Sequence, residues 1–148
     1  MKKAYCIGQT INNPTQSKLC IPDRIKSAKV EHFGVIIMDS GRKVLDVKVL
    51  YKGGVGSCVV DIKPILWAMA KKNATCAIVF HNHPSGNIEP SDEDKSLTKR
   101  LQSAFNVCCY HLLDHIIIAE NDWYSFKEND ALTSEEKLEE KVADLLRG

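Results

Sequence analysis

A short apolar run that ends in two histidines sets the strongest constraint on this chain. Residues 76–80 (Cys-Ala-Ile-Val-Phe) have the length and composition of a buried strand, and His81 and His83 follow almost directly. Because side chains alternate along a strand, these two histidines share one face. Two neutral imidazoles at the end of a rigid strand can bind one zinc ion at about 2.0–2.1 Å. Pro84 then ends the strand.

The next segment predicts a helix that carries a carboxylate toward the core. Ser91 is a favoured N-cap and acidic residues follow it, so we expect a helix over about 91–105. Asp94 lies three residues before Leu97 on the apolar stripe of this helix and therefore faces inward. A lone carboxylate is costly to bury unless it is paired or binds a metal. Two histidines and one carboxylate suit a zinc site whose fourth position is open to water.

Each of these residues also has an ordinary structural explanation when taken alone. A single histidine is more often a hydrogen-bonded or surface group, and Ser91-x-x-Asp94 alone is a variant of the capping box. The joint pattern H-x-H-x7-S-x2-D is far more specific, and it is formed by His81, His83, Ser91 and Asp94. It resembles the signature of the JAMM (JAB/MPN) metalloprotease domains. The flanking HNHPSG and PSxxD, with Leu-Asp-His-Ile-Ile-Ile at 113–118, resemble the RadC branch of that family.

The resemblance implies a fold. JAMM domains are three-layer α/β/α sandwiches with a mixed β-sheet, the JAB/MPN or cytidine-deaminase-like architecture. Independently, strands and helices interleave in this sequence, with a hairpin over about 30–51 before a helix over about 61–72, which predicts the α/β class. The glycine-containing stretch 53–57 lacks a nucleotide-binding pattern, so we expect a loop beside a substrate groove there.

The resemblance also implies the roles of individual residues. In JAMM domains a glutamate on an early strand is the general base, and Glu31 in Val-Glu-His-Phe resembles the RadC version of that segment. Ser91 would help to stabilise an oxyanion, while zinc would be bound by His81, His83 and Asp94. His115 is expected to be a core histidine or a partner of a zinc ligand, and Asp114 is expected to orient one of the ligands.

The resemblance covers residues 29–128 and divides the chain into three segments. We expect residues 1–28 to form a peripheral N-terminal arm with room for one strand. Residues 129–148 are expected to form a C-terminal helix, which starts at a capping box at 133–136 and either packs back on the domain or serves as an interface. The 148 residues fit one domain with a core of its own.

Composition predicts a cytoplasmic protein without a membrane partner. The content of 44% hydrophobic and 26% charged residues is typical of globular domains, and neither a membrane span nor a signal-peptide core stands out. The six cysteines include no C-x-x-C pair, so we expect reduced, packed thiols. Basic residues gather at the start of the chain and acidic ones at its end. They predict two solvated ends, with contact between the basic arm and a partner as the alternative.

The sequence therefore predicts a zinc-dependent metallohydrolase of the JAMM type, a peptidase or isopeptidase acting on a peptide or protein substrate. The alternative is a non-proteolytic DNA-repair or nucleic-acid accessory protein of the RadC family. The net charge of +1 argues against nucleic acid, and these residues leave no room for the helix-hairpin-helix domain that RadC proteins often carry. A zinc deaminase of similar fold is disfavoured because H-x-E and P-C-x-x-C are missing.

Overall fold

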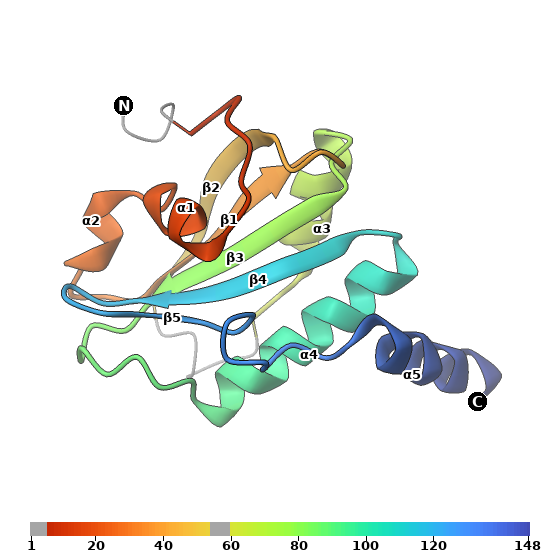
Figure 1. Cartoon of the computed structure of the whole chain (residues 1–148). Helices are drawn as coiled ribbons and strands as arrows, with labels where there is room; N and C mark the ends of the chain where they lie inside the picture. Colours follow the sequence, from red (N-terminus) through yellow and green to blue (C-terminus); the bar gives the residue numbers. More distant parts are fainter. Residues whose placement is uncertain (1–5, 54–59) are drawn as a thin grey trace.

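One mixed five-stranded sheet organises the protein, for which a computed structural model describes residues 6–53 and 60–148 (Figure 1). The strand order is β2-β1-β3-β4-β5. Strands β3 and β4 are parallel, and the other neighbouring pairs are antiparallel. The strands are β1 (His32–Met38), β2 (Val44–Lys52), β3 (Cys76–Asn82), β4 (His111–Ile118) and β5 (Trp123–Ser125). The predicted α/β fold with a mixed sheet is confirmed. The loop expected at 53–57 lies, apart from Gly53, outside the described residues.

Helices cover both faces of this sheet (Figure 1). On one face, α3 (Lys63–Lys71) and α4 (Asp92–Val107) bury their apolar stripes against alternate strand residues such as Val35 and Val79. On the other face, α1 (Pro14–Leu19) and α2 (Asp23–Lys26) lie over Ile36, Ile78 and their neighbours. β3 is buried on both faces over its whole length, as its continuous apolar run predicts.

The N-terminal segment differs from the expected peripheral arm. Ile11, Ile21 and Ile25 are buried, and they pack on the sheet as part of one of its two cores. The segment contains two short helices and an isolated bridge between Thr10 and Lys43, but no strand among its described residues. The physical reason is that the second face of the sheet is as apolar as the first and needs cover. The boundaries assigned to the three segments stay predictions.

Two of the six cysteines are not reduced, so that expectation is wrong for them. Cys6 and Cys20 form a disulfide with their Cα atoms 5.5 Å apart. The chain reverses at α1, whose C-cap is Cys20, while Gly8 and Val44 share a backbone hydrogen bond that fixes the stretch after Cys6 beside β2. Cys76 is free and buried, as expected. Cys108 and Cys109 are free but exposed, so the expected packing is wrong for these two, and Cys58 lies outside the described residues.

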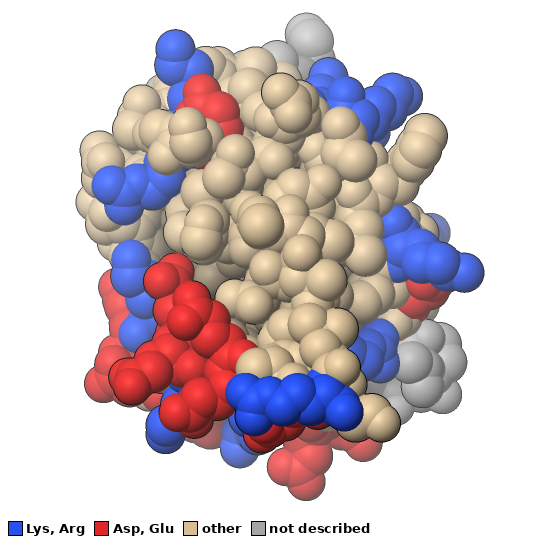
Figure 2. Space-filling view, turned by 90° about the vertical axis from the view of Figure 1, so that its right-hand side faces the viewer, with Lys and Arg blue, Asp and Glu red and all other residues tan. Residues whose placement is uncertain are grey.

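The terminal helix α5 (Glu135–Arg147) packs partly on the domain. Ser134 is its N-cap, and Leu138 and Val142 are buried. Leu145 and Leu146 are 74% and 78% exposed, so the last turn of α5 does not pack on the rest of the domain. Figure 2 shows acidic side chains gathered on the side of the molecule where α5 lies. Within the described residues, none of the helices is long and apolar enough to cross a membrane.

Candidate metal centre

The end of β3 brings two histidine rings together. His81 is the second last residue of the strand, and the N–H of His83 donates to the carbonyl of Ile118 at 3.0 Å, which continues the β4 pairing one residue further. The two rings therefore lie on one face, with their Nε2 atoms 2.9 Å apart. His81 is fully buried, whereas 13% of the His83 side chain is accessible to solvent.

Asp94 meets both rings from the first turn of α4. Its Oδ1 lies 3.1 Å from Nε2 of His81, and its Oδ2 lies 3.2 Å from Nε2 of His83. A reciprocal capping box fixes the carboxylate: Oδ2 accepts the N–H of Ser91 at 2.9 Å, and Ser91 Oγ accepts the N–H of Asp94 at 3.0 Å. Burial alone would raise the pKa of Asp94. The close contacts with the two histidines and the hydrogen bond from the N–H of Ser91 more than offset this, so the pKa is held well below its usual range.

Glu31, the residue just before β1, is the fourth side chain of this cluster. Its Oε1 lies 4.0 Å from Nε2 of His83. The ligand atoms of Glu31, His81 and His83 all lie within 4.8 Å of one another, which is close enough for one metal ion. The structure thus brings together His81, His83, Asp94 and Glu31, with Ser91 bonded to one of them. It offers two carboxylates, Asp94 and Glu31, to the same pair of histidines.

Asn82 holds the segment that carries Glu31, a role that the sequence analysis missed. Its side chain is fully buried on the face opposite the two histidines. Its Oδ1 accepts the N–H of His32 at 2.6 Å, and its Nδ2 donates to the carbonyls of Val30 at 3.2 Å and Ala28 at 3.3 Å. The backbone on both sides of Glu31 is therefore tied to the strand that carries the histidines. The signal in the sequence that could have pointed to this role was a polar residue, Asn82, at a core-facing position of a buried strand.

Replacing Asn82 by alanine should destabilise the protein. The change leaves the partly buried N–H of His32 and carbonyl of Ala28 without this partner, whereas the carbonyl of Val30 keeps Nδ1 of His32 at 2.8 Å. Each unsatisfied buried group costs about 1–3 kcal/mol unless water reaches it. We expect the free energy of unfolding in urea to fall by at least about 2 kcal/mol. Asn121→Ala, in the exposed turn before β5, should change it by no more than about 0.5 kcal/mol. Equal effects of the two changes would contradict the role of Asn82.

Both histidine rings direct Nε2 toward the centre, because Nδ1 of each ring contacts another group on the far side of the ring. Nδ1 of His83 lies 2.7 Å from the carbonyl of Asn87 and therefore donates to it. Nδ1 of His81 lies 2.8 Å from Nε2 of His115, which is fully buried on β4. Metal-binding histidines usually donate their second ring N–H in this way. The expectation that His115 partners a ligand histidine agrees with this contact.

Asp114 does not orient a histidine ring, so that expectation is wrong. Its carboxylate accepts the backbone N–H groups of His115 and Lys127 at 2.7 and 3.0 Å and the hydroxyl of Ser125 at 2.6 Å. Burial raises the pKa of Asp114, and these hydrogen bonds oppose the rise. The reason is strand parity, because neighbouring residues on β4 face opposite sides of the sheet. Asp114 therefore ties β4 to the end of β5 and to the turn that follows it.

The stability of the metal-free protein should depend on pH through the pair of His83 and Asp94. The hydrogen bond to Asp94 raises the pKa of His83 above 6.5, although burial opposes it. The stabilisation is therefore complete below pH 6.5 and is lost as pH rises through the folded-state pKa. Asp94 has a pKa below its ordinary 3.8, so its contribution is complete above pH 3.8 and is lost in stronger acid.

We therefore expect the melting temperature of chelator-treated protein to fall as pH rises above 6.5. Added zinc should reverse this trend, because the metal binds unprotonated histidines. Thermal unfolding over a pH series tests the prediction, with His83→Gln as the comparison. If the melting temperatures of the wild type and of His83→Gln changed in parallel with pH in the presence of chelator, the prediction would be contradicted.

An open cleft of about 450 Å³ leads from the centre to the surface. The loop between β3 and α4 forms much of its wall. Its lining includes the carboxylates of Glu31, Glu89, Glu93 and Asp94, and the polar side chains of Ser85, Asn87 and Ser91. No lysine or arginine is among the described residues that line it. The cleft therefore presents negative charge and hydrogen-bonding groups beside the two histidines.

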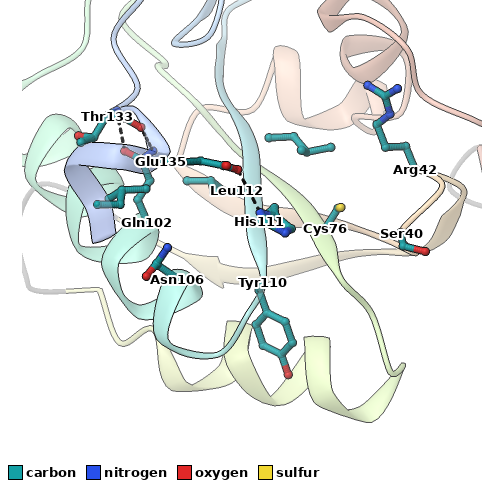
Figure 3. A pocket seen from close by; sticks show the side chains of 12 residues that line it. Ser40, Arg42, Cys76, Gln102, Asn106, Tyr110, His111, Leu112, Thr133 and Glu135 are labelled. Atoms are coloured by element: carbon teal, nitrogen blue, oxygen red, sulfur yellow. Dashed lines mark hydrogen bonds and ion pairs between the residues drawn. The ribbon is translucent and has the colours of Figure 1, made fainter. Parts of the chain in front are cut away.

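A second hollow of about 430 Å³ lies at the opposite end of β3 and β4 (Figure 3). Cys76 and His111, the first residues of these two strands, belong to its lining. Gln102 on α4 exchanges two hydrogen bonds with the backbone of Thr133, and His111 lies 3.4 Å from the carboxylate of Glu135. These contacts connect the start of α5 to α4 and β4. The hollow contains none of the residues of the metal centre.

Comparison with known proteins shows clear relatives. The sequence model of a RadC-like JAB domain matches residues 11–131. A UPF0758 protein of Actinobacillus pleuropneumoniae serotype 5b is 32% identical over 122 residues, which are 82% of this chain and 56% of that protein. A UPF0758 protein of Streptococcus pyogenes serotype M6 is 31% identical over 136 residues, or 89% and 60% of the two chains. The chain spans little more than half the length of these relatives, and the match begins within the N-terminal segment.

Proposed function

Because the chain belongs to the RadC-like JAB domain family, we propose that it is a zinc-dependent metallohydrolase that cleaves a peptide or isopeptide bond. One observation carries the proposal. Two Nε2 atoms and a buried carboxylate converge within 3.2 Å of one another, with a second carboxylate beside them at the mouth of an open cleft.

The donor set fits zinc. Two imidazole nitrogens and one carboxylate form a common catalytic zinc site, in which a fourth position stays open. We assign Asp94 as the ligand because its two oxygens lie 3.1 and 3.2 Å from His81 and His83, whereas Glu31 lies 4.0 Å from His83. Glu31 is also more exposed, with 22% of its side chain accessible against 3% for Asp94, which suits a residue that must exchange protons with the cleft.

The residues around this centre have the roles that amide hydrolysis needs. A zinc ion bound there would supply a Lewis acid and make water acidic enough to ionise near neutral pH. Glu31 takes a proton from the attacking water and delivers it to the departing amine, while a C–O bond forms and the C–N bond breaks. Ser91 already accepts the N–H of Asp94, so its own O–H is available to donate to the developing oxyanion.

The charge of the cleft favours a peptide over a nucleic acid. Nucleic acids are bound mainly by lysine and arginine contacts to phosphate, and the part of the chain that the structure describes places neither residue type in the lining of this cleft. Four carboxylates would instead repel a phosphate backbone, even with one divalent ion present. The alternative of a nucleic-acid accessory protein therefore gains no support from the candidate site.

A cleavage screen tests the proposal. The zinc-loaded protein is incubated with mixtures of linear peptides and of peptides joined through a lysine side chain, and the products are identified by mass spectrometry. We expect hydrolysis that stops with a chelator and returns with zinc. Cleavage that is insensitive to chelator would overturn the zinc mechanism. The absence of cleavage, together with DNA binding that weakens steeply with salt, would favour the accessory role.

A further inference from the structure

We propose that His115 and Thr98 are positioning residues of the metal centre, because they hold the ring proton of His81 on Nδ1 and so turn its Nε2 lone pair toward the metal. The inference rests on the proposed zinc site.

Three consecutive contacts connect α4, β4 and β3 behind the centre. The hydroxyl of Thr98 donates to the carbonyl of Asp94 at 2.8 Å. The same Oγ1 lies 2.7 Å from Nδ1 of His115, and Nε2 of His115 lies 2.8 Å from Nδ1 of His81. Thr98 is 1% exposed, and both histidines are fully buried. The chain of contacts begins at the backbone of Asp94 and ends at His81, so it joins two of the proposed ligands.

The contact between Thr98 and Asp94 determines which atom of each histidine ring carries its proton. A carbonyl oxygen only accepts, so the single hydroxyl proton of Thr98 goes to Asp94. Its oxygen must then accept from His115, which places the proton of that ring on Nδ1. The unprotonated Nε2 of His115 accepts in turn from Nδ1 of His81. This leaves Nε2 of His81 as the nitrogen that can bind a metal ion.

The surroundings of His115 keep it neutral and fix its plane. Its ring stacks on Phe126 with centroids 4.7 Å apart and an angle of 6° between the planes, and it meets the ring of Phe33 edge-on at 6.1 Å. A charged imidazolium would be costly between these apolar rings. A doubly protonated His115 would also need an acceptor at His81 Nδ1, which would place the proton of a neutral His81 on the metal-facing nitrogen.

The two proposed histidine ligands are therefore held in different ways. His83 donates to a backbone carbonyl, that of Asn87, which no substitution removes. His81 depends on the side chains of His115 and Thr98, which substitutions can change one at a time. This difference makes the contribution of the buried pair measurable.

Thr98→Val and Thr98→Ser form a matched pair for the test. Valine keeps the shape of threonine and removes the oxygen, whereas serine keeps the oxygen. Zinc affinity is measured at fixed pH by competition with a chelator. We expect Thr98→Val to weaken zinc binding by about 10-fold or more, within the 10–100-fold range usual for such partners, and Thr98→Ser to stay within about 3-fold of wild type. His115→Phe, which keeps an aromatic ring, should weaken it at least as much as Thr98→Val.

Long-range ¹H–¹⁵N spectra of the histidine rings give a readout that a merely structural role would not change. In zinc-loaded wild type, we expect the ring protons of His81 and His115 on Nδ1. A proton on Nε2 of His115, or unchanged zinc affinity in Thr98→Val, would overturn the proposal and leave the zinc hydrolase intact. Conversely, the expected affinities and spectra without any peptide cleavage would reject the hydrolase and retain the positioning roles.

Discussion

Replacing Asp94 by alanine is expected to lower the zinc content from about one ion per chain to almost none and to abolish hydrolysis. The change removes one of three proposed ligands, and two imidazoles alone hold zinc weakly at a position open to water. It also removes the acceptor for the N–H of Ser91, which should cost about 1 kcal/mol of stability. The zinc content is measured by elemental mass spectrometry on protein purified without a metal-binding tag.

Asp92→Ala is the matched control for this change. Asp92 lies in the same first turn of α4, but it is exposed and directed away from the core. It should keep its zinc, so a loss confined to Asp94→Ala is not a general effect of removing negative charge from the helix start. If Asp94→Ala kept its full zinc content and Glu31→Gln lost its zinc, Glu31 would be the zinc ligand in place of Asp94.

Glu31→Gln is expected to keep zinc and to lose most of its hydrolytic activity. Glutamine has the shape of glutamate but cannot take up a proton at neutral pH, so kcat should fall by about 10²–10⁴-fold. The zinc affinity should change little because the ion would be held by His81, His83 and Asp94. The measurement is kcat/KM on a substrate found in the screen, alongside zinc content for each preparation.

Glu120→Gln provides the comparison, since Glu120 is exposed in the turn between β4 and β5 and outside the cleft. Its activity should equal that of the wild type. Cleavage at wild-type rates by Glu31→Gln would remove Glu31 from the mechanism. Loss of zinc from Glu31→Gln alone would make Glu31 a ligand.

The sequence was sufficient to predict those parts of the centre that depend on local geometry. The alternation of β3 places His81 and His83 on one face, and the helical period places Asp94 on the stripe that contains Leu97. The capping box between Ser91 and Asp94 is likewise a property of four consecutive residues. Each of these features follows from the backbone of one element, so residue spacing alone was enough.

The parts that residue spacing left open, such as which histidine His115 contacts, or missed, such as the role of Asn82, depend on how distant elements pair. The contact between His81 and His115 follows from the parallel register of β3 and β4, in which Val79 lies opposite His115. Spacing within either strand does not specify that register. The same holds for Asn82, whose three backbone partners lie about 50 residues earlier in the chain. The cover of the second sheet face by the N-terminal segment is also a property of the assembled fold.

The most direct test of the central claim is an anomalous difference map, recorded at the zinc absorption edge on crystals of the zinc-loaded protein. We expect one peak at about 2.0–2.2 Å from Nε2 of His81, Nε2 of His83 and a carboxylate oxygen of Asp94. Glu31 should lie beyond bonding distance from the ion, on the side of the cleft. A peak bonded to Glu31 in place of Asp94 would contradict the assignment, and the absence of a peak at these histidines would contradict the zinc centre itself.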